Sequence, residues 1–198
     1  MSSKPAGHGI VLGAFMLAAA TGAYAESHQF SQAGSLKIDA GAERSATLHL
    51  ACSPDKDGGA LSIELVVPDA NTRRDFDYDD FEGPDAAAGG KALSHLVWTS
   101  AAGTTEIHYP AAGWYAPEPP ESFIFGVSQM SHRREPPAKL LAAIGADAGK
   151  LMWTQTGFDK ATRKLVATFE LDPAAAAKAR DAVASCLPAS KPGGKSGG

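Results

Sequence analysis

The chain contains only two cysteines, and their positions constrain the fold because they lie far apart in the sequence. Cys52 ends the alternating run 47–52, whose apolar residues share one face of a predicted strand. Cys186 ends an alanine-rich stretch that begins at Pro173 and has the spacing of a helix. A disulfide between them would stabilise the fold by roughly 5 kcal/mol in the chain-entropy model. The alternatives are a redox pair and a zinc site, but there is no C-x-x-C motif and too few histidines at ligand spacing.

The first 25 residues favour the disulfide because they predict export. Lys4 gives a positive start, residues 10–20 form an apolar run, and Ala23 and Ala25 before Glu26 are the small residues that a signal peptidase requires. The apolar run is about half of the roughly 20 residues that a membrane span needs. We therefore expect cleavage between Ala25 and Glu26. The mature protein is then periplasmic or secreted, where an isolated cysteine pair usually becomes a disulfide.

The remaining chain predicts one domain, residues 26–188, followed by a tail, residues 189–198, whose Gly, Ser, Lys and Pro residues predict disorder. The net charge of the whole chain is -4, and it becomes -5 when Lys4 leaves with the leader. An acidic domain without a basic stripe is a poor candidate for binding nucleic acid or an anionic membrane. The pattern indicates no cofactor and no further membrane span, and it leaves the oligomeric state open.

Most of the predicted domain has the period of two that is typical of strands. The predicted strands are residues 35–40, 46–52, 60–67, 94–100, 104–109, 123–128, 150–156 and 163–171, after a polar lead at 26–34. Helices are predicted from Pro136 to Ile144 and from Pro173 to Cys186, the second with Asp172 as N-cap. The expected fold is mainly β: an antiparallel β sandwich or partly open barrel, with a short middle helix and a C-terminal helix disulfide-tied to an early strand.

The acidic stretch, residues 69–85, is the most unusual part of the sequence, with seven acids against two arginines. From Asp75 onward it resembles the opening of a calcium-binding EF-hand loop, but position six is Asp80 in place of glycine and position twelve is Ala86 in place of glutamate. The candidate calcium ligands are Asp75, Asp77 and Asp79. The alternative is structural: Phe76 and Tyr78 point inward, and the three aspartates face water and protect a sheet edge.

A second candidate surface is the proline-rich segment 108–120. Prolines stiffen a loop, and aromatic rings on a stiff loop stack on sugars, peptides or partner side chains at low entropic cost. The candidate binding residues are Tyr109, Trp114 and Tyr115. The alternative is that these rings close the end of the domain as part of its core.

No catalytic residues are predicted. Residues 126–130 begin like the nucleophile elbow of an esterase, but the closing glycine is missing. The sequence therefore favours a protein that is not an enzyme, although an enzyme with an unrecognised site stays open.

The arrangement of the two cysteines resembles that of two groups of small periplasmic bacterial proteins. These are the VasI-type accessory proteins of type VI secretion and the invasion-associated locus B proteins. The strand 48–52 that ends in the first cysteine, the strand 61–65, and the segment 169–171 before the helix to Cys186 carry the likeness. The resemblance implies a periplasmic two-cysteine β domain and assigns no site residues.

Three functions are consistent with these features. The first is a periplasmic binding or accessory module that contacts a protein or a cell-envelope ligand. The second is an inhibitor of a hydrolase such as lysozyme, because a small acidic exported domain suits a basic enzyme cleft. The third is the enzyme with an unrecognised site.

Overall fold

The structure is a computed structural model that describes residues 28–54, 59–116, 121–130, 136–159 and 163–187. The predicted leader and tail lie outside these ranges. The strands are β1 (His28–Ile38), β2 (Arg44–Ser53), β3 (Ala60–Val67), β4 (Ser94–Ser100), β5 (Gly103–Tyr109), β6 (Ala112–Ala116), β7 (Ser122–Met130), β8 (Gly149–Thr156) and β9 (Lys164–Leu171). The helices are α1 (Ala70–Arg73), η1 (Tyr78–Phe81), α2 (Pro137–Ala146), α3 (Pro173–Val183) and η2 (Ala184–Cys186). None of the helices in the described part has the length and apolar character that a membrane crossing requires.

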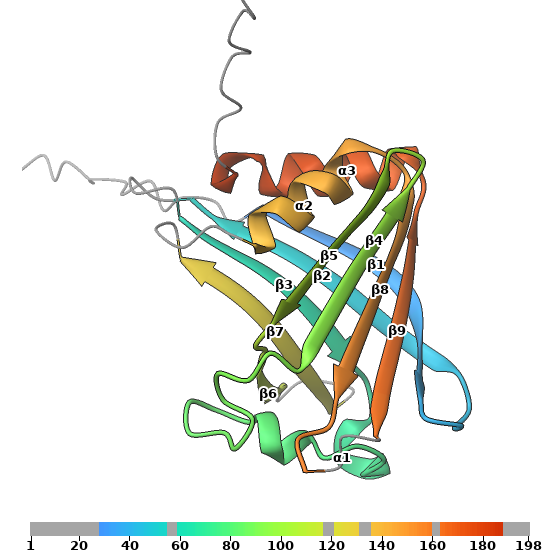
Figure 1. The fold of residues 1–198 in the computed structure, drawn as a ribbon, viewed down its shortest axis with the longest axis vertical. Coiled ribbons are helices and arrows are strands. Elements are labelled where there is room, and N and C mark those ends of the chain that lie inside the picture. The colour runs from blue at the N-terminus through green and yellow to red at the C-terminus, as the bar shows by residue number, and fades with distance from the viewer. Residues whose placement is uncertain (1–27, 55–58, 117–120, 131–135, 160–162, 188–198) are drawn as a thin grey trace, which may run out of the picture.

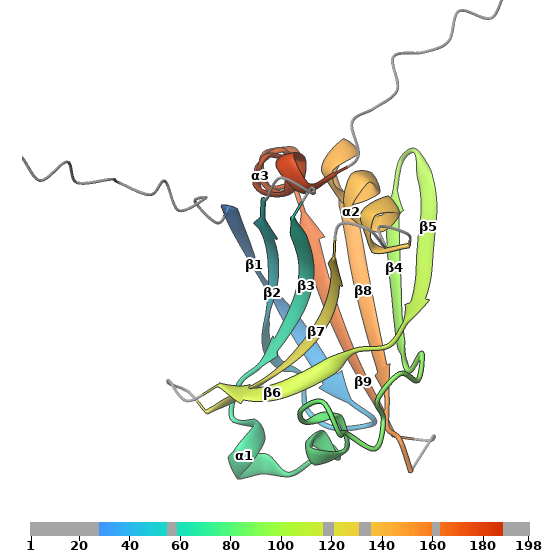
Figure 2. The same cartoon turned by 90° about the vertical axis from the view of Figure 1, so that its left-hand side faces the viewer.

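The described strands form one antiparallel sheet in the order β5-β4-β8-β9-β1-β2-β3-β7-β6. Figures 1 and 2 show this sheet curled into a partial barrel, with α2 and α3 across one end and α1 near the other. The edge strands β5 and β6 are consecutive in the chain and are joined by Pro110 and Ala111. The predicted mainly β fold with a partly open barrel is therefore confirmed, and the strands share a single sheet rather than the two sheets of a sandwich.

The core lies inside the curled sheet and follows from the alternation of side chains along each strand. In β3, Leu61, Ile63, Leu65 and Val67 are buried, as the sequence pattern predicted. Each such side chain contributes about 2 kcal/mol when it leaves water. Near α1 the core is aromatic: its rings come from Phe76, Tyr78, Phe81, Phe123 and Phe125, with centroids 4.8 to 6.1 Å apart.

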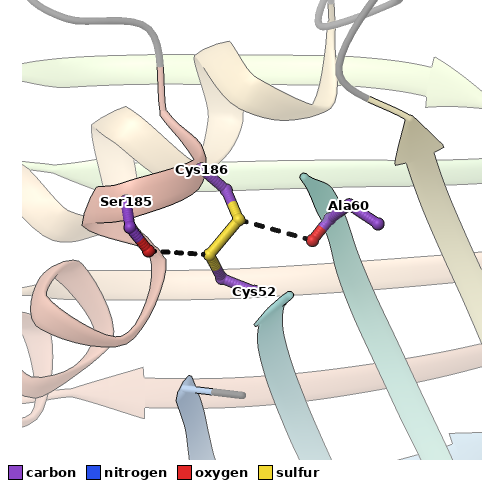
Figure 3. The surroundings of a disulfide bond; sticks show 4 residues. All are labelled: Cys52, Ala60, Ser185 and Cys186. Atoms are coloured by element: carbon purple, nitrogen blue, oxygen red, sulfur yellow. Dashed lines mark hydrogen bonds between the residues drawn. A yellow bond between two sulfur atoms is a disulfide. The ribbon is translucent and has the colours of Figure 1, made fainter. Parts of the chain in front are cut away.

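The predicted disulfide between Cys52 and Cys186 is present and joins the end of β2 to η2, directly after α3 (Figure 3). The two Cα atoms are 5.9 Å apart, and both residues are buried. At the start of α3, the Asp172 carboxylate accepts a hydrogen bond of 2.7 Å from the backbone N–H of Ala175. This satisfies one of the free donors of the first helical turn and confirms the predicted N-cap.

The structure corrects three parts of the sequence interpretation. Residues 28–34 are the first part of β1 and pair with β2, and they are not a polar lead. Residues 112–116 form the edge strand β6, although the proline-rich segment predicted a loop. The acidic stretch is not itself a strand: it folds into α1 and η1 across the barrel end opposite α2 and α3, and its end contacts the edge strand β6, where the Gly83 N–H donates to the Gly113 carbonyl at 3.0 Å.

Candidate functional site

The acidic stretch and β6 together form a polar pocket of about 580 Å³, which we call the acidic pocket. Among the residues described, its lining carries four aspartates and one arginine. The lining residues are Ala70, Asn71, Arg74, Phe76, Asp77, Tyr78, Asp79, Asp80, Tyr115 and Asp159. The excess of carboxylates suits a cationic ligand, and the pocket brings the acidic stretch and one aromatic residue of the proline-rich segment into one site.

Arg44 anchors the acidic stretch to the barrel from the start of β2. Its Nη2 lies 3.1 Å from both carboxylate oxygens of Asp75 and donates to the Tyr78 hydroxyl at 3.2 Å. The Arg44 side chain is only 12% exposed and the Asp75 side chain is 35% exposed, so this charge pair is partly removed from water. The prediction that Asp75 faces water is therefore corrected to partial exposure, because Arg44 holds one side of its carboxylate.

Arg163, just before β9, makes the second link to the acidic stretch. Its Nη1 lies 3.6 Å from an Asp77 carboxylate oxygen and donates to the backbone carbonyl of Asp75 at 3.4 Å. The Asp77 side chain is about one third exposed, so the prediction of a fully solvated aspartate is also corrected here. The two arginines hold the segment so that Phe76 and Tyr78 enter the aromatic core, and that inward orientation is confirmed.

The Tyr78 hydroxyl lies at the centre of this network. It accepts from Arg44 and donates to the Asp75 carboxylate at 3.2 Å. Burial raises the pKa of the Tyr78 phenol well above its ordinary value, and the charge of Asp75 raises it further, against the opposing effect of Arg44. Tyr78 is therefore a neutral structural support of the pocket floor.

Tyr115 forms one wall of the acidic pocket from β6. Its ring packs edge-on against Phe123 at 4.9 Å, and its hydroxyl donates to an Asp79 carboxylate oxygen at 2.7 Å. Burial, followed by this hydrogen bond, raises the pKa of the Tyr115 phenol well above its ordinary value. Tyr115 therefore positions the Asp79 carboxylate at the rim of the pocket through a hydrogen bond from a neutral donor.

The three predicted aromatic binding residues do not form one surface. Successive residues of a strand point to opposite faces, so Trp114 lies on the outer face of β6 while Tyr115 points toward the pocket. Trp114 is 40% exposed, and its six-membered ring packs over Gly126 on β7. A Cβ added at Gly126 would lie 2.8 Å from the Trp114 ring. Tyr109, at the end of β5, is partly buried against the core.

The candidate calcium ligands are held apart by their partners. Asp75 pairs with Arg44, Asp77 pairs with Arg163, and Asp79 accepts from Tyr115. Within the described ranges, no group of three or more His, Cys, Asp or Glu side chains is arranged to hold a metal ion. The calcium hypothesis therefore gains no support from the geometry. The serine of the elbow-like segment, Ser128, is an ordinary position within β7.

Sequence reasoning missed the two arginines that position the pocket and the fourth aspartate of its lining. Arg44 is 31 residues from Asp75, and Arg163 is 88 residues from it. Asp159 enters the lining from the loop after β8. No local pattern links these residues, because only the curling of the sheet brings the start of β2, the end of β8 and the start of β9 to one end of the barrel.

Comparison with protein-family models, with curated proteins and with solved structures found no match. The resemblance to the VasI-type and invasion-associated locus B proteins therefore stays a prediction. The functional argument depends on the geometry and charge of the acidic pocket.

Proposed function

We propose that this protein is an exported binding module that acts through protein contacts and receives a basic side chain of its partner in the acidic pocket. The observation that carries this proposal is the lining of the pocket, in which four aspartates accompany one arginine among the described residues. A lysine or arginine side chain fits such a site because a carboxylate forms its strongest hydrogen bonds with a charged donor.

The electrostatics favour a local cationic contact over general attraction. Charges more than about 8 Å apart are largely screened at physiological ionic strength. The net charge of -4 therefore matters less than the carboxylates that surround one cavity. Asp79 lines this cavity, and its partner Tyr115 is a neutral donor and not a cation.

Two features support export. The disulfide is of the kind that persists in oxidising compartments, and the first 25 residues have the pattern of a cleavable signal. A periplasmic or secreted protein meets its partner in the cell envelope or outside the cell. An inhibitor of a basic hydrolase such as lysozyme is the alternative that the same pocket favours, because a basic enzyme cleft would present the required side chains.

Calorimetric titration of the full chain with a decalysine peptide and with lysozyme tests the proposal. The pocket variant is Asp79→Asn with Asp159→Asn. The matched control is Glu170→Gln with Asp181→Asn, two acids in exposed ion pairs away from the pocket, which changes the net charge by the same amount. We expect the pocket variant to bind the peptide about tenfold more weakly, as the loss of two modest charge contacts implies.

The control variant should bind the peptide as the unmodified protein does. Equal weakening in both variants would mean that binding depends on overall charge and would contradict the proposal. Lysozyme separates the two functions: binding with loss of lysis supports an inhibitor, and binding with undiminished lysis supports a module without inhibitory activity.

A further inference from the structure

Two histidines form a stacked pair on the outer face of the sheet, on strands that contribute no residue to the lining of the acidic pocket. His95 on β4 and His108 on β5 are directly opposite each other in the antiparallel register. Their rings are stacked with centroids 4.0 Å apart and planes only 4° apart. Glu106 precedes His108 by two residues and shares its face, and its Oε2 lies 3.2 Å from Nε2 of His95.

We propose that His95 and His108 chelate a first-row transition-metal dication of the zinc type. Imidazole nitrogens bind Zn²⁺ at about 2.0 to 2.1 Å, so two of them on one tetrahedral ion lie about 3.3 Å apart. Directly opposite residues of paired strands hold their Cβ atoms about 5 Å apart, so both imidazoles already share one small volume. The stacked rings are parallel, so both side chains, which reach the surface, rotate out of the stack to direct one nitrogen of each ring at the same ion.

Glu106 is the acceptor that orients His95, since its Oε2 lies 3.2 Å from Nε2 of that ring. A carboxylate that accepts from the second ring nitrogen fixes the orientation of a metal-binding histidine. The pair alone is a two-imidazole chelate, and water fills the remaining positions. Such a site binds more weakly than a structural site with four protein ligands, and it differs from the metal groups of three or more side chains, which the described residues lack.

The chemistry of the donors selects the metal. Imidazole suits zinc, copper and nickel, whereas calcium and magnesium require oxygen ligands. The site also has a structural consequence, because β5 is an edge strand that pairs only with β4. An ion held between His95 and His108 links the edge strand to its neighbour, so metal binding stabilises the folded state.

Titration of the full, tag-free chain with Zn²⁺, followed by calorimetry and by the thermal unfolding midpoint, tests this proposal. Zn²⁺ is the probe because the predicted cleavage after Ala25 would leave a free amino terminus at Glu26, two residues before His28. That terminus would itself chelate Cu²⁺ or Ni²⁺ in a square plane. The variants are His95→Gln, His108→Gln and Glu106→Gln. The matched control is His49→Gln, because His49 lies opposite Glu64 on β2 and β3 and has no second imidazole beside it in the register.

We expect one Zn²⁺ per chain at this site and a higher unfolding midpoint with Zn²⁺ but not with Ca²⁺. Glu106→Gln should weaken Zn²⁺ binding by about tenfold, as the loss of an orienting carboxylate implies, and each of the two histidine variants should weaken it by more than that. The His49→Gln control should bind as the unmodified chain. Three results would each overturn the proposal: no saturable Zn²⁺ binding, unchanged binding in His95→Gln and His108→Gln, or equal weakening in the His49→Gln control.

Discussion

Replacing Cys52 and Cys186 together by alanine removes the disulfide without leaving a thiol, and it tests how the C-terminal helix is held. The buried face of α3 consists of small side chains: Ala176, Ala179, Ala182 and Val183. At about 0.8 kcal/mol for each buried methyl and about 1.5 to 2 kcal/mol for the valine, this face contributes about 4 kcal/mol. The helix is therefore weakly anchored by apolar contacts alone.

The disulfide contributes at least as much as that apolar face. Its cysteines are 134 residues apart in the sequence, and the chain-entropy model gives about 5 kcal/mol for a loop of that size. With a urea slope of about 2 kcal/mol/M, the double alanine variant should unfold at a urea concentration lower by about 2.5 M. Reduction of the unmodified protein should produce a loss of similar size.

Equilibrium urea unfolding, followed by circular dichroism, measures this loss. The control is Ser185→Ala, because the Ser185 hydroxyl contacts Sγ of Cys52 at 3.0 Å and its removal leaves the covalent bond intact (Figure 3). We expect the control to lose less than about 1 kcal/mol. A loss below about 1 kcal/mol in the double alanine variant would refute the argument that the bridge is the main anchor of α3.

Three further predictions follow from the core and from the support of the pocket. Gly113→Ala should cost about 3 kcal/mol in urea unfolding, because a Cβ there would overlap the buried Phe123 ring. Arg44→Ala should lower the free energy of unfolding by about 2 kcal/mol, which is less than the loss for a fully buried ion pair because Asp75 is 35% exposed. A free energy of unfolding that stays within about 0.5 kcal/mol of the unmodified protein, one quarter of that loss, would contradict this. The folded-state pKa values of Tyr78 and Tyr115 are raised, so the stability that these two residues contribute is complete below about pH 10 and is lost as the pH rises further. Tyrosinate absorbance that saturates near pH 10 in the folded protein would contradict this prediction.

The strands that could be predicted are those in which apolar residues alternate without interruption. β3 is the clearest case, because Leu61, Ile63 and Leu65 alternate with polar residues and every second residue from Leu61 to Val67 is buried. The first part of β1 escaped prediction because Phe30 is its only large apolar residue, and its polar neighbours face outward. β6 escaped because prolines and glycine surround it, and its pairing with β7 depends on contacts that local propensity does not encode.

The candidate site could be predicted only in part, for a similar reason. The composition of residues 69–85 marked the acidic stretch, and the alternation correctly placed Phe76 and Tyr78 in the core. The charges of Asp75 and Asp77 are balanced by arginines from β2 and from the start of β9, which no spacing along the chain reveals. Long-range ion pairs therefore converted an expected solvated edge into the lining of a pocket.

The most direct test of the account is to map where a basic peptide binds on the protein. Amide chemical shifts of the isotope-labelled full chain, followed during titration with the decalysine peptide, locate the contact residue by residue. We expect the largest changes on Arg74, on residues 76–80, on Tyr115 and on Asp159, which line the acidic pocket. Changes confined to other acidic positions, such as Glu170 and Asp181, or no saturable change at all, would contradict it.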